Sequence, residues 1–143
     1  MKSIRKVLFT AGNYPKNIDF ALLFLRLVIG IFMLTHGVGK FQKLFGDGPV
    51  QFADPIGIGE NASLALAVLA EFFCSILLIL GIITRPAALI LIINMSVAAF
   101  IAHAGDAFMV REMALLYLAV YIVMAIAGAG KFSIDHWIDK RSK

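Results

Sequence analysis

Four long apolar segments, separated by shorter polar or glycine-rich stretches, dominate the pattern of the chain. They cover residues 20–39, 62–84, 86–105 and 113–130. Each is close to the roughly 20 residues that a helix needs to cross a hydrocarbon core about 30 Å thick. Because backbone polar groups in lipid must be satisfied within their own segment, we expect four helices. The pattern predicts an all-α integral membrane four-helix bundle.

Composition supports this class and excludes others. Of the 143 residues, 61% are hydrophobic and only 15% are charged, against about 25% charged in ordinary soluble domains. The spans use most of the length, which leaves no room for a separate soluble catalytic domain. Cys74 is the only cysteine, so an intramolecular disulfide, a CxxC redox pair and a cysteine zinc site are excluded within one chain.

The flanking segments differ in character. Residues 1–19 read as a basic arm on the cytoplasmic membrane surface, and residues 131–143 as a cytoplasmic amphipathic tail whose helix starts at Ser133 or Asp135. Residues 41–60 contain three phenylalanines, which a merely solvated loop would not need. We expect this segment to cap the outer end of the bundle, and the alternative is a mobile loop that dips its aromatic rings into the membrane interface.

The basic residues set the orientation. Net charge is +4, but its placement is more informative, because cytoplasmic loops of membrane proteins are enriched in Lys and Arg. With the N-terminus inside, nine basic residues lie on the inner side and three on the outer side. The nine are Lys2, Arg5, Lys6, Lys16, Arg85, Lys131, Lys140, Arg141 and Lys143; the three are Lys40, Lys43 and Arg111. We therefore predict N-in/C-in topology and no nucleic-acid partner.

One helix carries charge where a membrane helix should have none. Along RLVIGIFMLTHGVGK, helical spacing places one polar stripe on an otherwise apolar helix. Its members are Arg26, Gly30, Met33, His36 or Gly37, and Lys40. Such a stripe needs a partner or a cavity, and we expect the function to lie along it.

Counting residues along the predicted spans sorts the polar side chains within the membrane by depth. The inner group consists of Arg26, Asn94, Ser75 and Tyr121, and the outer group consists of Glu71, His36, His103, Glu112 and Lys40. Glu71 is the most informative, because a midplane acid costs on the order of 3 kcal/mol to insert. It must be protonated, paired or facing a wet cavity. His36 matches it best in depth, and Arg26 could reach toward it.

The histidines leave one further alternative open. His36 and His103 could hold a haem, or a metal together with Glu71 and Glu112. Two histidines do not make a motif, and we predict no metal site. His103 also lies about half a turn from Asn94 around its helix, so both are not expected to face one axis squarely.

Three pieces of the chain, in this order and spacing, resemble the DoxX family of small four-helix membrane proteins. They are RLVIGIFMLTHGVGK, AEFFCSILLILGIITRPAAL and GKFSID. The resemblance implies a multi-pass protein of the bacterial cytoplasmic (inner) membrane. Some relatives are linked to quinone-coupled sulfur oxidation and others to membrane complexes that respond to oxidative stress. The resemblance identifies no agreed set of catalytic residues in this chain.

Three functional hypotheses follow. The first is a membrane subunit that binds a quinone-like amphiphile and supports redox or oxidative-stress chemistry, with electrons supplied by a partner protein because no flavin, haem or iron–sulfur motif is present. Glu71 and His36 would handle protons, and Arg26 or Lys40 would bind a carbonyl. The second is a structural or assembly subunit, and the third a small proton-linked carrier, which would need homo-oligomerisation or a wet path.

Overall fold

The computed structural model describes residues 11–141, and every regular element in that range is a helix. Seven of the eight described helical elements form the bundle: α2 (Lys16–Leu44), α3 (Glu60–Val68), η1 (Leu69–Cys74), α4 (Ser75–Leu80), α5 (Thr84–Val97), η2 (Ala98–Ala102) and α6 (Phe108–Ala127). The last element, α7 (Ile134–Arg141), follows the bundle. The segments η1 and η2 are π-helical, which means that their hydrogen bonds skip one residue more than those of an α-helix.

Four helices are long and apolar enough to span a membrane, as the hydrophobic pattern predicts. They are Lys16–Leu44, Glu60–Leu80, Thr84–Ala102 and Phe108–Ala127. The first is longer than expected at both ends. Residues 41–44, assigned to the connecting loop, continue α2, because Phe41 stacks on Phe72 with ring centroids 4.5 Å apart. Of the expected basic arm, residues 1–10 lie outside the described part of the chain.

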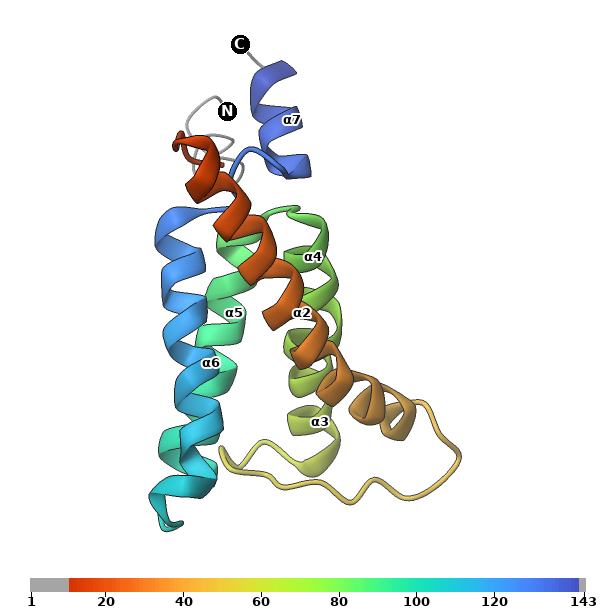
Figure 1. The fold of residues 1–143 in the computed structure, drawn as a ribbon. Coiled ribbons are helices and arrows are strands. Elements are labelled where there is room, and N and C mark those ends of the chain that lie inside the picture. Colours follow the sequence, from red (N-terminus) through yellow and green to blue (C-terminus); the bar gives the residue numbers. More distant parts are fainter. Residues whose placement is uncertain (1–10, 142–143) are drawn as a thin grey trace.

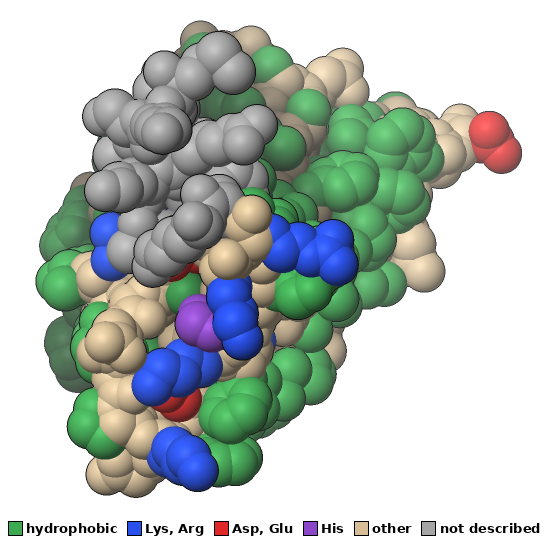
Figure 2. All heavy atoms as spheres, turned by 90° about the horizontal axis from the view of Figure 1, so that it is seen from above, with side chains coloured by type: hydrophobic (Ala, Val, Ile, Leu, Met, Phe, Trp, Pro, Cys, Tyr) green, Lys and Arg blue, Asp and Glu red, His purple; other side chains and the backbone are tan. Residues whose placement is uncertain are grey.

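The two ends of the bundle are easily told apart (Figure 1). The start of α2 and helix α7 lie at one end, which we call the terminal end, and the loop between α2 and α3 lies at the other, which we call the loop end. Seen from above the terminal end, Lys and Arg side chains gather on this face (Figure 2). Four spans bring both ends of the chain to one side, and which side is cytoplasmic stays a prediction from the charges.

A buried arginine fastens the terminal end. The Arg26 side chain, 2% exposed, donates to the backbone carbonyls of Ala129 and Phe132, the latter at 2.7 Å, and at 3.4 Å to that of Ile79. Gly81, with φ +68°, packs so closely that a Cβ there would lie 3.0 Å from the guanidinium carbon. Arg26 therefore joins α2, the end of α4 and the segment after α6.

Asp135 completes this fastening. Its carboxylate, in a residue 1% exposed, accepts hydrogen bonds from the backbone N–H groups of Ile83 at 2.7 Å and Thr84 at 2.9 Å. These are amides at the start of α5 that no helical carbonyl can satisfy. Of the two helix starts predicted from the sequence, Ser133 rather than Asp135 caps α7, since its hydroxyl accepts from the His136 N–H at 3.2 Å. The piece GKFSID thus helps to hold the terminal end together.

Candidate functional site

Glu71 lies in the π-helical segment η1 and is only 4% exposed. The Lys40 ammonium donates to both of its carboxylate oxygens. The Asn94 side-chain amide donates to Oε1 at 3.0 Å. Three different spans therefore meet at this carboxylate. The pairing satisfies the requirement that a charge inside the membrane be neutralised by a partner.

The close packing of α2 on η1 makes the pair possible. The buried residues of α2 include Arg26, Gly30, Met33 and Gly37, so the predicted stripe is the packed face, with Gly37 rather than His36 on it. A Cβ on Gly37 would lie 2.5 Å from the Glu71 carbonyl carbon and oxygen. Only glycine allows this approach without a backbone shift, and the approach brings Lys40, one turn further on, to the carboxylate.

A cleft of about 570 Å³ opens beside this pair. Its walls come from α3, η1, α5, η2 and the loop. The polar lining residues are Lys40, Ser63, Glu71, Asn94 and His103; the others are Phe52, Ala53, Pro55, Ile56, Leu66, Ala67, Leu69, Ala70, Ile90, Ile93, Val97, Ala98 and Ala102. An apolar cavity with a few convergent polar groups is the usual form of a small-ligand site.

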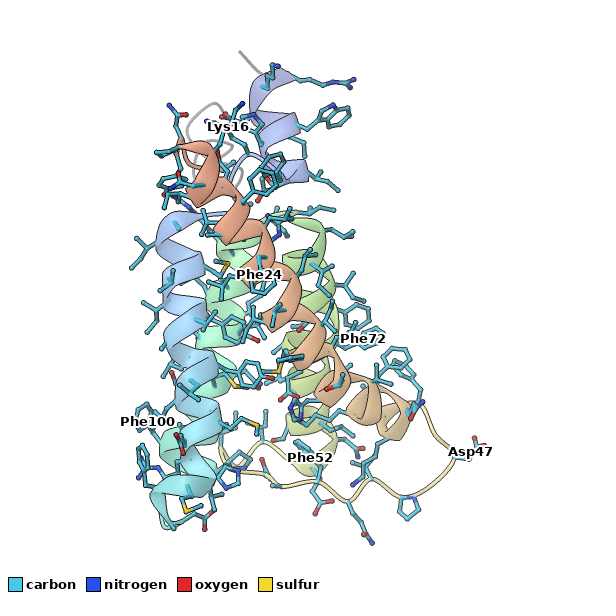
Figure 3. All side chains as sticks on the ribbon, in the orientation of Figure 1. Lys16, Phe24, Asp47, Phe52, Phe72 and Phe100 are labelled. Carbon is cyan, nitrogen blue, oxygen red and sulfur yellow. The ribbon has the colours of Figure 1, made fainter. Side chains whose placement is uncertain are left out.

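The loop covers the cleft at the loop end. Its tip at Asp47 points away from the bundle, whereas Phe52 lies on the returning arm beside α3 (Figure 3). The Phe52 ring centroid is 5.9 Å from the Lys40 nitrogen, within the range of a cation–π contact. Phe52, Pro55 and Ile56 all line the cleft. The expected cap over the bundle is therefore present.

Asp54 holds this cap in shape. Its carboxylate accepts from the Ser63 hydroxyl at 2.7 Å, the Gly59 N–H at 2.7 Å and the Ile58 N–H at 3.0 Å. The hydrogen bonds from Ser63 and Gly59 hold the pKa of Asp54 below its ordinary value, because they stabilise the charged form. Asp54 is not among the residues predicted from the sequence, although an Asp before Pro55 in a glycine-rich stretch is a recognisable turn signal.

The expected pairing of His36 with Glu71 is wrong. His36 is one position round from Gly37, and this step of about 100° turns it off the packed face. It is exposed and lies edge-on to Tyr117, with ring centroids 6.1 Å apart. Both line a separate groove of about 450 Å³ between α2 and α6.

Two further expectations, the reach of Arg26 toward Glu71 and the group assigned to Asn94, are also wrong. Arg26 does not reach toward Glu71, because its guanidinium is held at the terminal end by backbone carbonyls. Asn94, assigned to the group of Arg26, binds Glu71 instead. Counting residues treats helices as upright and parallel, whereas α2 crosses the bundle obliquely (Figure 1). Tyr121 is fully buried in the core beside Tyr117.

His103 and Asn94 both line the cleft, although the residue spacing predicts about half a turn between them around the helix. The reason is η2 between them, where the His103 N–H bonds to the Ala98 carbonyl five residues back at 3.0 Å. This π-helical turn changes the register of the helix. The His103 ring also contacts the Asp106 carboxylate at 2.7 Å, and Glu112 is exposed near the start of α6.

The haem and metal alternative gains no support from this geometry. Across residues 11–141, no three His, Cys, Asp or Glu side chains come together in a way that could hold a metal ion. The two histidines of this alternative also lie at different places, His36 in the groove beside α6 and His103 in the cleft. The site is therefore a cleft beside a carboxylate, an ammonium and an amide.

Comparison with known proteins gives a consistent result. The sequence model of the DoxX family, described as DoxX, matches residues 21–104. An uncharacterized protein of Haemophilus influenzae is 33% identical over 137 residues, covering 91% of this chain and 99% of the relative. The Escherichia coli protein named "Inner membrane protein YqjF" is 28% identical over 127 residues, with 86% and 95% covered. The Bacillus subtilis protein named "Putative oxidoreductase CatD" is 26% identical over 129 residues, with 90% and 94% covered. No solved structure matches this chain.

Proposed function

This chain belongs to the DoxX family and is a multi-pass protein of the bacterial inner membrane, and on that premise we propose that it binds a quinone-like amphiphile in the cleft beside Glu71. The bound molecule takes part in redox chemistry together with a partner protein. The observation that carries the proposal is the meeting of Lys40, Glu71 and Asn94 at the wall of an otherwise apolar cleft.

The polar groups suit the head of such a molecule. A quinone ring carries carbonyl oxygens that accept hydrogen bonds, and Lys40 and Asn94 are donors. Lys40 also stabilises the negative charge that develops on a carbonyl oxygen as electrons arrive. We propose that Glu71, held beside both, relays protons: it takes up each proton from water and passes it to a quinone oxygen as the electrons arrive. His36 lies in the groove beside α6, so we no longer assign it to this step.

Electrons must come from elsewhere. The proposed reaction takes two electrons and two protons to convert a quinone to a hydroquinone, and the electrons come from a redox protein docked on the membrane protein. The name of the Bacillus subtilis relative, which contains the word oxidoreductase, supports a redox setting. The chain itself is proposed to bind the quinone and to deliver protons to it.

One observation favours a second candidate, a structural or assembly subunit. Lys40 and Asn94 already satisfy the Glu71 carboxylate without any ligand. In that case the polar cluster only fixes the packing of three spans, and the replacement of Glu71 would lower stability without changing any bound molecule.

The test is purification in mild detergent, followed by extraction and mass spectrometry of bound small molecules. The variants are Lys40→Met and Glu71→Gln, with His36→Ala as the control because His36 lies outside the cleft. We expect a quinone to co-purify with the wild type and the control, and the amount of bound quinone to fall strongly in both cleft variants. Ordinary lipid alone in all four proteins would refute quinone binding. Equal quinone in all four would refute the role of the cleft.

A further inference from the structure

We infer that the ligand enters the cleft sideways from the bilayer, between α3 and α5, and that its apolar tail lies in this opening. The inference rests on the proposed function and specifies its ligand class: a polar head with a long alkyl or isoprenoid tail, delivered from the lipid phase rather than from water.

The loop lines the loop end of the cleft, where Ile56 stays 45% exposed. The returning arm of the loop places Phe52, Pro55 and Ile56 against the cleft. Asp54 fixes this arm to the first turns of α3, through the Ser63 hydroxyl and two backbone N–H groups. Three hydrogen bonds to one carboxylate make a stiff turn. A ligand from the aqueous phase would have to displace it.

The side of the cleft is open toward lipid. On the two spans, four large apolar residues line the cleft and yet keep much of their surface exposed: Leu66 49%, Leu69 45%, Ile90 37% and Ile93 65%. The first two belong to α3 and η1, and the other two to α5. In a membrane these surfaces contact acyl chains. The slot between the two spans is therefore a lipid-facing opening continuous with the cleft.

Small side chains line part of the cleft. Ala67 and Ala70, only 6% and 1% exposed, face it from one wall, and Ala98 and Ala102 line it from the other. These small side chains leave room for a flat ring between the spans. Glu71 and Asn94, which are hydrogen-bonded to each other, line the same cleft. The cleft thus has a polar inner part for the head and an apolar mouth for the tail.

The experiment compares two probes on purified protein in lipid nanodiscs: a quinone without a tail, and a quinone of the same ring with an isoprenoid tail. The variant Ile93→Trp fills the mouth of the slot. Ile126→Trp is the matched control, because Ile126 is 73% exposed on α6 and does not line the cleft. Binding is followed by quenching of the intrinsic fluorescence of each protein.

We expect Ile93→Trp to raise the Kd of the tailed quinone about tenfold and to leave the Kd of the tailless quinone as in wild type. Ile126→Trp should change neither Kd. A second variant, Ile93→Ala, widens the slot and should speed association of the tailed probe alone. Equal effects on both probes, or none on either, would overturn side entry and leave the proposed function standing. Failure of both probes to bind wild type would overturn the proposed function itself.

Discussion

The substitution Gly37→Ala tests the packing on which the polar cluster depends. A Cβ at this position would lie 2.5 Å from both the carbonyl carbon and the carbonyl oxygen of Glu71, and 2.6 Å from the Phe72 nitrogen. These atoms belong to backbone, so no side chain can move aside. Ordinary contact begins near 3.4 Å, so α2 and η1 must separate by about 1 Å, and overpacking of this kind costs about 1–3 kcal/mol.

Gly39→Ala is the matched control on the same helix, because a Cβ there meets nothing within 4 Å. Alanine favours a helix over glycine by about 1 kcal/mol, and this gain is common to both variants. The measurement is the free energy of unfolding in mixed micelles, followed by circular dichroism. We expect Gly39→Ala to equal or exceed wild type and Gly37→Ala to fall below it. Equal stability of the two variants would refute the close contact of α2 with η1.

Three further predictions concern other parts of the molecule. Arg26→Lys leaves one nitrogen for three carbonyls on two segments, and should lower the unfolding free energy by about 2–3 kcal/mol without changing ligand binding. Unchanged stability would contradict the role of Arg26 in holding the terminal end together. Because the pKa of Asp54 is lowered in the folded state, the ionised carboxylate stabilises the fold. This contribution to the free energy of unfolding is complete above the unfolded pKa of about 3.9 and is lost as pH falls through the lower folded value. Unfolding measured against pH should show this loss in wild type and not in Asp54→Asn. N-in/C-in topology predicts that Asp47→Cys reacts with a membrane-impermeant maleimide from outside intact cells, and that Lys140→Cys reacts only after permeabilisation. The native Cys74 is buried and should not react in either case. The reverse pattern would contradict this topology.

The sequence predicts the spans well because hydrophobic length is a local property. The four apolar segments, the packed stripe on α2 and the start of α7 at Ser133 can all be read from residue spacing alone. The cap is predicted for the same reason, since phenylalanines such as Phe52 in a glycine-rich loop require a surface to cover. These inferences need no knowledge of how one helix crosses another.

The partner of Glu71 could not be predicted in the same way. Lys40 and His36 are one turn apart, and the choice between them depends on the crossing of α2 over η1 at Gly37. The alignment of Asn94 with His103 depends on the π-helical turn η2. Neither a crossing angle nor a π-helical turn has a reliable signature in residue spacing, because both arise from packing between segments far apart in the chain.

Labelling with a photoreactive tailed quinone tests the central claim most directly, because it locates the binding site. Membranes containing the protein are irradiated with the probe, and the labelled peptides are identified by mass spectrometry with and without excess unlabelled quinone. We expect labelling of residues 63–71 and 90–103 that excess quinone prevents and that Lys40→Met removes. Competed labelling of residues 113–120 on α6, beside the groove that His36 lines, would contradict it.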